Sequence, residues 1–145
     1  MNFRTHTSLL LLTGVMTAVG ATAAFADTVV KVRLTGESHE KMGLEAVPPS
    51  VPAGKVEFDV TNAAMKTGHE MILVKLATKG ETLPLDPAKH RIDEKAIKSL
   101  GEVSNLKAGA NGVLKASVTP GDYMLICNIK GHYESGMAAP FTVTP

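Results

Sequence analysis

Residues 121–137 are GDYMLICNIKGHYESGM, and this stretch restricts the fold of the chain more than any other. Tyr123, Leu125 and Cys127 lie two positions apart, so their side chains share one face of a strand. The residues that follow include two glycines, which permit the tight turns of a loop. We therefore predict a strand over residues 121–127 and a loop from its end to residue 137.

Similar strand patterns occur before and after this stretch. They cover residues 28–34, 55–61, 69–76, 112–118 and 139–143. Residues 69–76 are apolar on both faces beyond their first two positions, as expected for a central strand covered on both sides. Prolines at positions 48, 49 and 52 predict a loop between the first two strands. Short strands with Gly and Pro turns predict an all-β antiparallel sandwich or barrel.

Residues 78–101 interrupt this rhythm. Pro84 and Pro87 are followed at residues 93–98 by DEKAIK, a composition that favours one or two helical turns. We predict a short helical insertion around residues 84–100, between two strands of the sandwich.

The first 26 residues differ in composition from the rest. Arg4 gives a basic start, residues 8–20 are rich in Leu, Val and Met, and Ala24-Phe25-Ala26 resembles a cleavage site. We predict a signal peptide over residues 1–26 that is cleaved, leaving one domain over residues 27–145 that is exported, for example to a periplasm. The alternative is an uncleaved anchor, but the apolar run is shorter than the ~20 residues of a spanning helix.

Composition excludes several classes of function. A formal charge of +1 over 145 residues does not indicate a nucleic-acid binder or a polybasic membrane-surface protein. The single cysteine, Cys127, excludes an intramolecular disulfide, a four-cysteine zinc site and an iron–sulfur cluster held by this chain alone. A free thiol in an oxidising compartment is at risk unless it is buried, metal-bound or catalytic.

Three possible metal donors follow the strand that ends near residue 127. Cys127, His132 and Met137 offer a thiolate, an imidazole and a thioether, a mixture that suits copper in both of its oxidation states. A fourth donor must come from elsewhere, and His69 is best placed because it begins a central strand. A trigonal set of two His and one Cys with a weak axial Met is the blue-copper arrangement.

The pattern Gly121-x-Tyr123-x-x-x-Cys127-x4-His132-x4-Met137, with His69 upstream, resembles the cupredoxin family of small type 1 blue copper proteins. The ligand-loop spacing is similar to that of rusticyanin and stellacyanin. This resemblance implies an eight-stranded Greek-key sandwich holding one copper, with His69, Cys127 and His132 equatorial and Met137 axial. One departure is Glu70, because the residue after the first histidine ligand is commonly Asn or Ser in this family.

The same resemblance implies an exported electron carrier that cycles between Cu(I) and Cu(II) and is not an enzyme. Its partners would be redox proteins, such as cytochromes or copper oxidoreductases, that dock transiently near His132. We expect a monomer with no nucleic-acid partner and no membrane span after cleavage. The alternative is a periplasmic copper-handling protein for delivery, storage or resistance, although the methionines are scattered and not clustered.

Each donor also has a simpler interpretation. Cys127 and Met137 could fill the core, His132 could be a surface residue, and His69 could be a core histidine.

Three further side chains lie outside the predicted ligand set. His39 and Met42 form either a weak second copper site or, as we prefer, part of a solvated loop. His90 is expected to be exposed on the insertion, and Met65 to cover the copper end of the sandwich.

Overall fold

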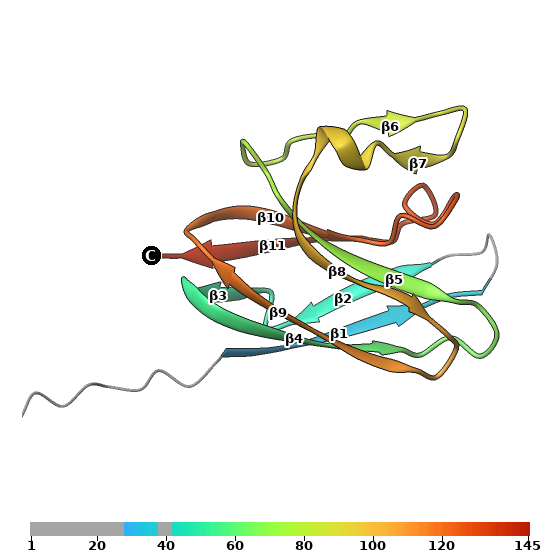
Figure 1. The fold of residues 1–145 in the computed structure, drawn as a ribbon, viewed down its shortest axis with the longest axis horizontal. Helices are drawn as coiled ribbons and strands as arrows, with labels where there is room; N and C mark the ends of the chain where they lie inside the picture. Colours follow the sequence, from blue (N-terminus) through green and yellow to red (C-terminus); the bar gives the residue numbers. More distant parts are fainter. Residues whose placement is uncertain (1–27, 38–41) are drawn as a thin grey trace, which may run out of the picture.

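The computed structural model describes residues 28–37 and 42–145, which form two facing β-sheets (Figure 1). The first sheet has the order β2 (Gly43–Val47), β1 (Thr28–Thr35), β4 (Gly54–Asn62), β9 (Asn111–Val118). The second has the order β3 (Ser50–Pro52), β11 (Ala138–Thr144), β10 (Gly121–Ile126), β5 (His69–Lys75), β8 (Lys98–Leu106). A separate ribbon pairs β6 (Leu85–Asp86) with β7 (Arg91–Ile92), and one 3₁₀ turn, η1, covers Glu94–Ala96. The predicted all-β sandwich is confirmed.

The main core lies between the two sheets. Alternate side chains of β4 point inward, and Phe58 meets Phe141 of β11 edge-to-face with ring centroids 5.4 Å apart. Met71 and Leu73 of β5 face the same core as Leu125, all with no exposed surface. The strand period assigned from the sequence therefore places the predicted inward face of each strand correctly.

Two strand pairs are parallel, which corrects the expectation of a wholly antiparallel sandwich. β1 pairs with β4 and β3 pairs with β11 in parallel register. Residues 50–52 were expected to be loop, yet they form a three-residue edge strand. Proline is tolerated there because one edge of the strand needs no ladder hydrogen bonds. Residues 43–47 also form a strand, in which Leu44 and Ala46 alternate inward.

The insertion spans residues 76–97 and is only slightly helical. It consists of the β6–β7 ribbon and the single turn η1, where the Asp93 carboxylate accepts a hydrogen bond from the Lys95 N–H at 3.1 Å. The expected range of 84–100 ends too late, because β8 begins at Lys98 and pairs there with Lys75. Figure 1 shows the insertion lying over β5 and β10, outside the sandwich.

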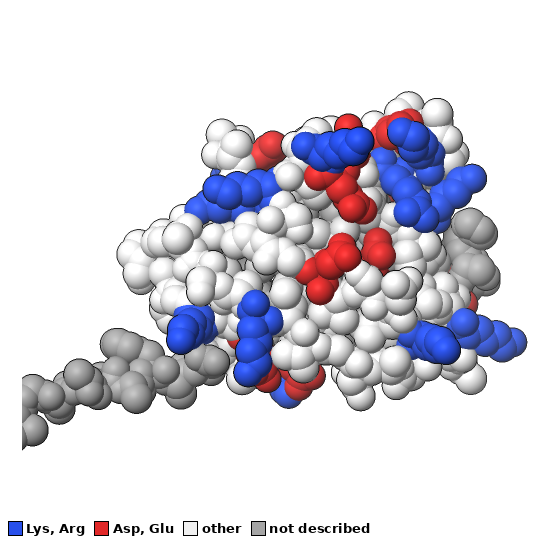
Figure 2. All heavy atoms as spheres, viewed as in Figure 1, with Lys and Arg blue, Asp and Glu red and all other residues white. Residues whose placement is uncertain are grey.

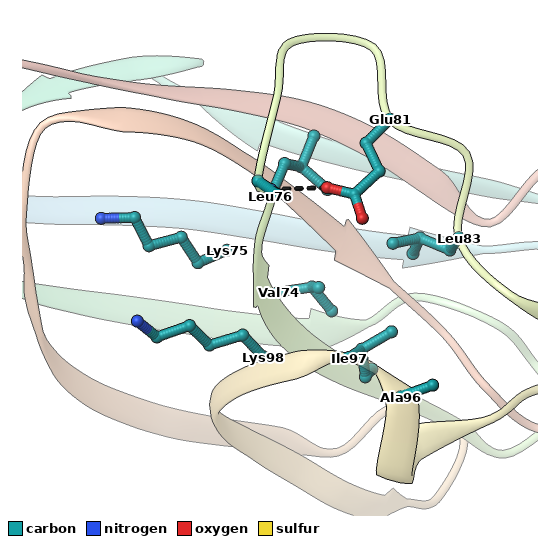
Figure 3. Close-up of a pocket in the computed structure, with 9 residues that line it drawn as sticks. Val74, Lys75, Leu76, Glu81, Leu83, Ala96, Ile97 and Lys98 are labelled. Atoms are coloured by element: carbon teal, nitrogen blue, oxygen red, sulfur yellow. Dashed lines mark hydrogen bonds between the residues drawn. The ribbon is translucent and has the colours of Figure 1, made fainter.

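A second apolar cluster joins the insertion to the outer face of the second sheet. Leu83 and Ile92 pack with Ile72, Val74 and Ile126. This explains why β5 is apolar on both faces, as the sequence predicted for a central strand. Where the insertion joins β5 and β8, a groove of about 420 Å³ remains. Figure 3 shows Val74, Leu83 and Ile97 lining it.

The predicted signal peptide and His39 lie outside the described residues. Within the described part of the chain, no helix is both long enough and apolar enough to cross a membrane. The assignment of residues 1–26 as a cleaved leader therefore stays a prediction.

Candidate metal centre

Two adjacent strands bring the predicted donors to one end of the sandwich. β10 and β5 are antiparallel, with Ile126 opposite Ile72, so the end of β10 lies beside the start of β5. His69 is the first residue of β5, and Cys127 follows the last residue of β10. The loop of residues 127–137 and the loop before His69 therefore meet at the right-hand end of Figure 1.

Three donor atoms converge at this end. The possible ligand atoms of His69, Cys127 and His132 all lie within 4.8 Å of one another. The two Nδ1 atoms of the histidines are 3.2 Å apart, and Cys127 Sγ is 3.4 Å from His132 Nδ1. His69 and Cys127 have no exposed surface, and His132 is 7% exposed. Among the described residues, no other group of His, Cys, Asp and Glu side chains is arranged to hold a metal.

A hydrogen bond of the His69 ring determines which of its nitrogens faces Cys127 and His132. Nε2 lies 3.1 Å from the backbone oxygen of Gly36, which can only accept, so Nε2 carries the proton in the neutral ring. Burial lowers the pKa of His69 and keeps the ring neutral. Its Nδ1 lone pair is therefore directed at Cys127 and His132, where a metal ion would bind.

The thiol of Cys127 is held in its neutral form in the absence of metal. Burial raises the pKa of Cys127 to about 11, although backbone N–H groups of Ile129 and Glu70 direct hydrogen bonds at the sulfur and lower it. The Glu70 nitrogen lies 3.5 Å from Sγ. A soft cation at this point would displace the proton and provide the charge that burial otherwise disfavours.

Short-range backbone hydrogen bonds shape the ligand loop. The Cys127 N–H donates to the Met137 oxygen, and the Met137 N–H donates to the His132 oxygen, both at 3.1 Å. Met137 has no exposed surface and belongs to the same apolar cluster as Cys127. The loop thus folds back on itself and returns Met137 to the neighbourhood of the strand it left.

The segment before His69 is held by the side chains of Asn62, the last residue of β4, and Glu37, which follows β1. Buried Asn62 donates through Nδ2 to the backbone oxygens of Thr67 and Leu106, each at 2.9 Å. The Glu37 carboxylate accepts from the Met65, Lys66 and Thr67 N–H groups, and from the Thr67 hydroxyl at 2.8 Å. These bonds, led by the one from Met65, lower the pKa of Glu37. The sequence carried no signal for Glu37, because its partners are backbone groups.

Glu70 links the two ligand segments directly. Its Oε1 accepts a hydrogen bond from the Asn128 N–H at 3.0 Å, so the residue beside His69 is bonded to the residue beside Cys127. Burial raises the pKa of Glu70, with Glu102 and Glu94 adding to the shift. Glu70, at the position where the resemblance leads us to expect Asn or Ser, therefore joins the two ligand segments.

Three residues outside the predicted ligand set, Met42, His90 and Met65, can be compared with the places expected for them. Met42 is buried in the main core and donates its N–H to the Ser135 oxygen at 3.3 Å, so it is not part of a solvated loop. His90 is exposed, as expected, and pairs with Glu134 at 2.9 Å. Met65 is 85% exposed, so its side chain does not cover the copper end of the sandwich as expected.

The facing sheets and the buried His-Cys-His group define a cupredoxin. Residues 18–144 match the sulfocyanin (SoxE) domain family, and the chain belongs to this family of blue copper proteins. No curated protein sequence matches the chain.

Solved structures with the same fold include auracyanins and rusticyanin. Auracyanin B is 25% identical, with 88% of this chain and 94% of that chain covered and a TM-score of 0.58. Auracyanin A, a blue copper protein of Chloroflexus aurantiacus, is 19% identical, with 82% and 100% covered and a TM-score of 0.62. Rusticyanin from Thiobacillus ferrooxidans is 16% identical, with 80% and 76% covered and a TM-score of 0.57.

The donor set fits the cofactor of this family. A buried thiol and two imidazoles within 4.8 Å supply soft and intermediate donors, which suit copper, and not the oxygen ligands that Ca²⁺ and Mg²⁺ prefer. The protein is accordingly a type 1 copper protein with one copper per chain.

Proposed function

We propose that this chain is an exported electron carrier whose copper is held by His69, Cys127 and His132, with Met137 as the weak axial ligand. The observation that carries the proposal is the buried group of two Nδ1 atoms and Sγ, fixed by backbone and side-chain hydrogen bonds. Copper, when bound, supplies one-electron chemistry by alternating between Cu(I) and Cu(II).

The scaffold around these residues suits fast electron transfer. His69 is fixed by Gly36, and the ligand loop is fixed by its own backbone bonds. Donors held in one geometry do not rearrange when the charge at the site changes, so little reorganisation opposes the transfer. No catalytic residue is assigned, because electron transfer alone requires no substrate pocket at the site.

His132 is the proposed route for the electron. It is the only one of the three clustered donors with measurable exposure, at 7% against none for His69 and Cys127. The exposed Met65 side chain stands on the neighbouring loop and offers an apolar contact for a redox protein. Acidic and basic side chains are interspersed on the face drawn in Figure 2, and neither charge predominates there. At the copper end itself, the exposed Met65 side chain would allow transient docking by small apolar contacts.

Electron self-exchange tests the function directly. NMR line broadening in mixtures of the Cu(I) and Cu(II) proteins is expected to reveal fast exchange, with copper retained in the presence of a chelator. Slow exchange with rapid loss of copper to the chelator would favour the alternative, a copper-handling protein. The burial of Met42, Met71 and Met137 leaves few thioethers at the surface for copper capture, which favours the carrier.

Docking can be tested separately. Met65→Lys at the copper end should slow self-exchange. Two copies of the protein meet at this end during self-exchange, and each copy of the variant would bring a positive charge to the contact. Val47→Lys is the matched control, since Val47 is 55% exposed on β2 and is far along the sheet from the ligand loops. Equal rates in both variants would contradict docking near His132.

A further inference from the structure

The connection between β5 and β8 is much longer than these strands require. Lys75 and Lys98 are paired opposite each other in antiparallel register, and a two-residue turn would suffice to join them. Residues 76–97 stand in place of that turn, so the insertion has some other role.

Covering apolar surface explains only part of the insertion. Leu83 and Ile92 shield Ile72, Val74 and Ile126 from water. Apolar packing of this kind needs no polar partner, yet the insertion also makes directional hydrogen bonds to one particular side chain of the ligand loop.

That side chain is Asn128, which is 1% exposed and directly follows Cys127. Its Oδ1 accepts from the Ile92 N–H at 2.6 Å, and its Nδ2 donates to the Ile92 oxygen at 3.0 Å. The same Nδ2 donates to Glu94 Oε1 at 2.8 Å. The amide thus bonds both backbone groups of one residue of β7, as a neighbouring strand would, and reaches η1 as well.

A second set of contacts joins the insertion to the ligand loop further along. The Gly131 N–H donates to the His90 oxygen at 2.9 Å, and the His90 ring pairs with the Glu134 carboxylate at 2.9 Å. The loop is therefore bonded to the insertion at Asn128 and at Gly131, on either side of Lys130. His132 directly follows Gly131.

The Asn128 contacts affect the hydrogen bonding at the sulfur of Cys127. The backbone N–H of Glu70 donates to Cys127 Sγ at 3.5 Å, and the backbone N–H of Ile129, on the far side of Asn128, also acts on the thiol. The backbone N–H of Asn128 is held by Glu70. With the backbone N–H and the side chain of Asn128 restrained, the Glu70 and Ile129 N–H groups keep their positions near Sγ. Hydrogen bonding at this sulfur tunes the potential of a blue-copper site.

We propose that Asn128 is a positioning residue for Cys127 and that the insertion braces the ligand loop through it. The proposal rests on the assignment of Cys127 as a copper ligand. A hydrogen bond to the sulfur withdraws charge that would otherwise stabilise Cu(II), so loss of the brace lowers the reduction potential.

The test compares substitutions on the two sides of the contact. Asn128→Ala removes all three side-chain bonds, Glu94→Ala removes one of them, and Glu94→Gln keeps an acceptor oxygen in place. Thr82→Ala is the control, because Thr82 is exposed on the same insertion and no hydrogen bond of the described residues uses it. The Glu94 pair keeps the test valid if Asn128→Ala folds poorly.

Voltammetry and the visible spectrum of the Cu(II) proteins form the first measurement. Asn128→Ala should shift the preference between Cu(II) and Cu(I) about tenfold toward Cu(II), which is about 59 mV lower in potential, and change the ratio of the charge-transfer bands. Glu94→Ala should change the potential and the band ratio in the same direction, by a smaller amount, when it is compared with Glu94→Gln, which has the same charge. Thr82→Ala should match wild type.

Amide hydrogen exchange of the metal-free proteins forms the second measurement. The Ile129 and Gly131 amides should exchange at least tenfold faster in Asn128→Ala than in Thr82→Ala. This readout needs no copper, so it tests the brace even if the ligand assignment fails. Unchanged potentials, spectra and exchange rates, with only a lower melting temperature, would overturn the proposal.

Discussion

The two segments that supply the proposed ligands are held in opposite ways. The loop of residues 127–137 is shaped by backbone bonds between its own residues, as between Cys127 and Met137. The segment before His69 is held by side chains outside it, those of Asn62 and Glu37, and the His69 ring itself is held by the oxygen of Gly36. The loop also has contacts with the insertion, but it keeps its internal bonds when one of them is lost. We conclude that removing a single outside contact should perturb the loop less than it perturbs the segment before His69.

The largest expected effect follows from Cys127→Ser. A serine hydroxyl cannot provide the thiolate charge transfer or its affinity for copper, so the intense visible band should be abolished. The variant should stay folded, because two apolar clusters form without metal. Absorption and circular dichroism check both points. An intense colour in this variant would remove Cys127 from the site.

Asn62→Ala tests the distant support of His69. The substitution removes a buried hydrogen bond to the Leu106 oxygen and a part-buried one to the Thr67 oxygen, and should cost about 1–3 kcal/mol of stability. It should also weaken copper binding, because the segment before His69 loses its anchor. Thermal unfolding with and without copper measures both effects.

Thr61→Ala is the matched control for Asn62→Ala, since the Thr61 hydroxyl bonds only to Asn111 at the exposed edge. If Asn62→Ala destabilised the metal-free protein but left copper affinity unchanged, the His69 side would not depend on this anchor.

Substitutions of Met137, on the ligand loop, should have an effect of intermediate size. Met137→Leu should leave copper bound and coloured while raising the reduction potential, because an apolar group stabilises Cu(II) less than a thioether does. Met137→Gln should lower the potential, since a carbonyl oxygen is a harder donor. Voltammetry on both variants is the measurement. Potentials that match wild type would make Met137 a core residue.

The smallest effect is expected at Glu37 and depends on pH. Its pKa is lowered below the ordinary 4.5, so its stabilising bonds are present above that value and are lost as the pH falls through the lowered pKa. Glu37→Gln should therefore slightly lower the melting temperature at pH 7, and the difference from wild type should vanish in acid.

Glu45→Gln serves as the control for Glu37→Gln, because Glu45 is an exposed glutamate of β2. A difference between Glu37→Gln and wild type that persisted or grew in acid would contradict the assigned role of the carboxylate.

These contrasts also explain what the sequence could predict. Cys127, His132 and Met137 lie at fixed spacings on one loop, so their grouping was readable from local pattern. His69 required the strand phase, and the antiparallel pairing of β5 with β10 brings it to Cys127. Gly36 and Glu37 were beyond prediction, because a backbone oxygen and a clamp on backbone N–H groups leave no residue pattern.

The strands also differ in how far the sequence predicts them. The pattern of apolar residues identified β1, β4, β5, β9, β10 and β11, but β3 has only three residues and lies among prolines. No strand was predicted at β8, and its first residues were assigned to the insertion; the pairing of β8 with β5 is interrupted by two register shifts. The polar contacts of Asn128 with Ile92 depend on tertiary placement, so the role of the insertion emerged only from the structure.

The central claim is a type 1 copper held by Cys127 and two histidines. Titration of the metal-free protein with Cu(II), followed by visible absorption, tests it most directly. The account predicts an intense thiolate-to-copper band that rises linearly and stops at one copper per chain. A titration that ends at one copper with no intense visible band, or that never saturates, would contradict it.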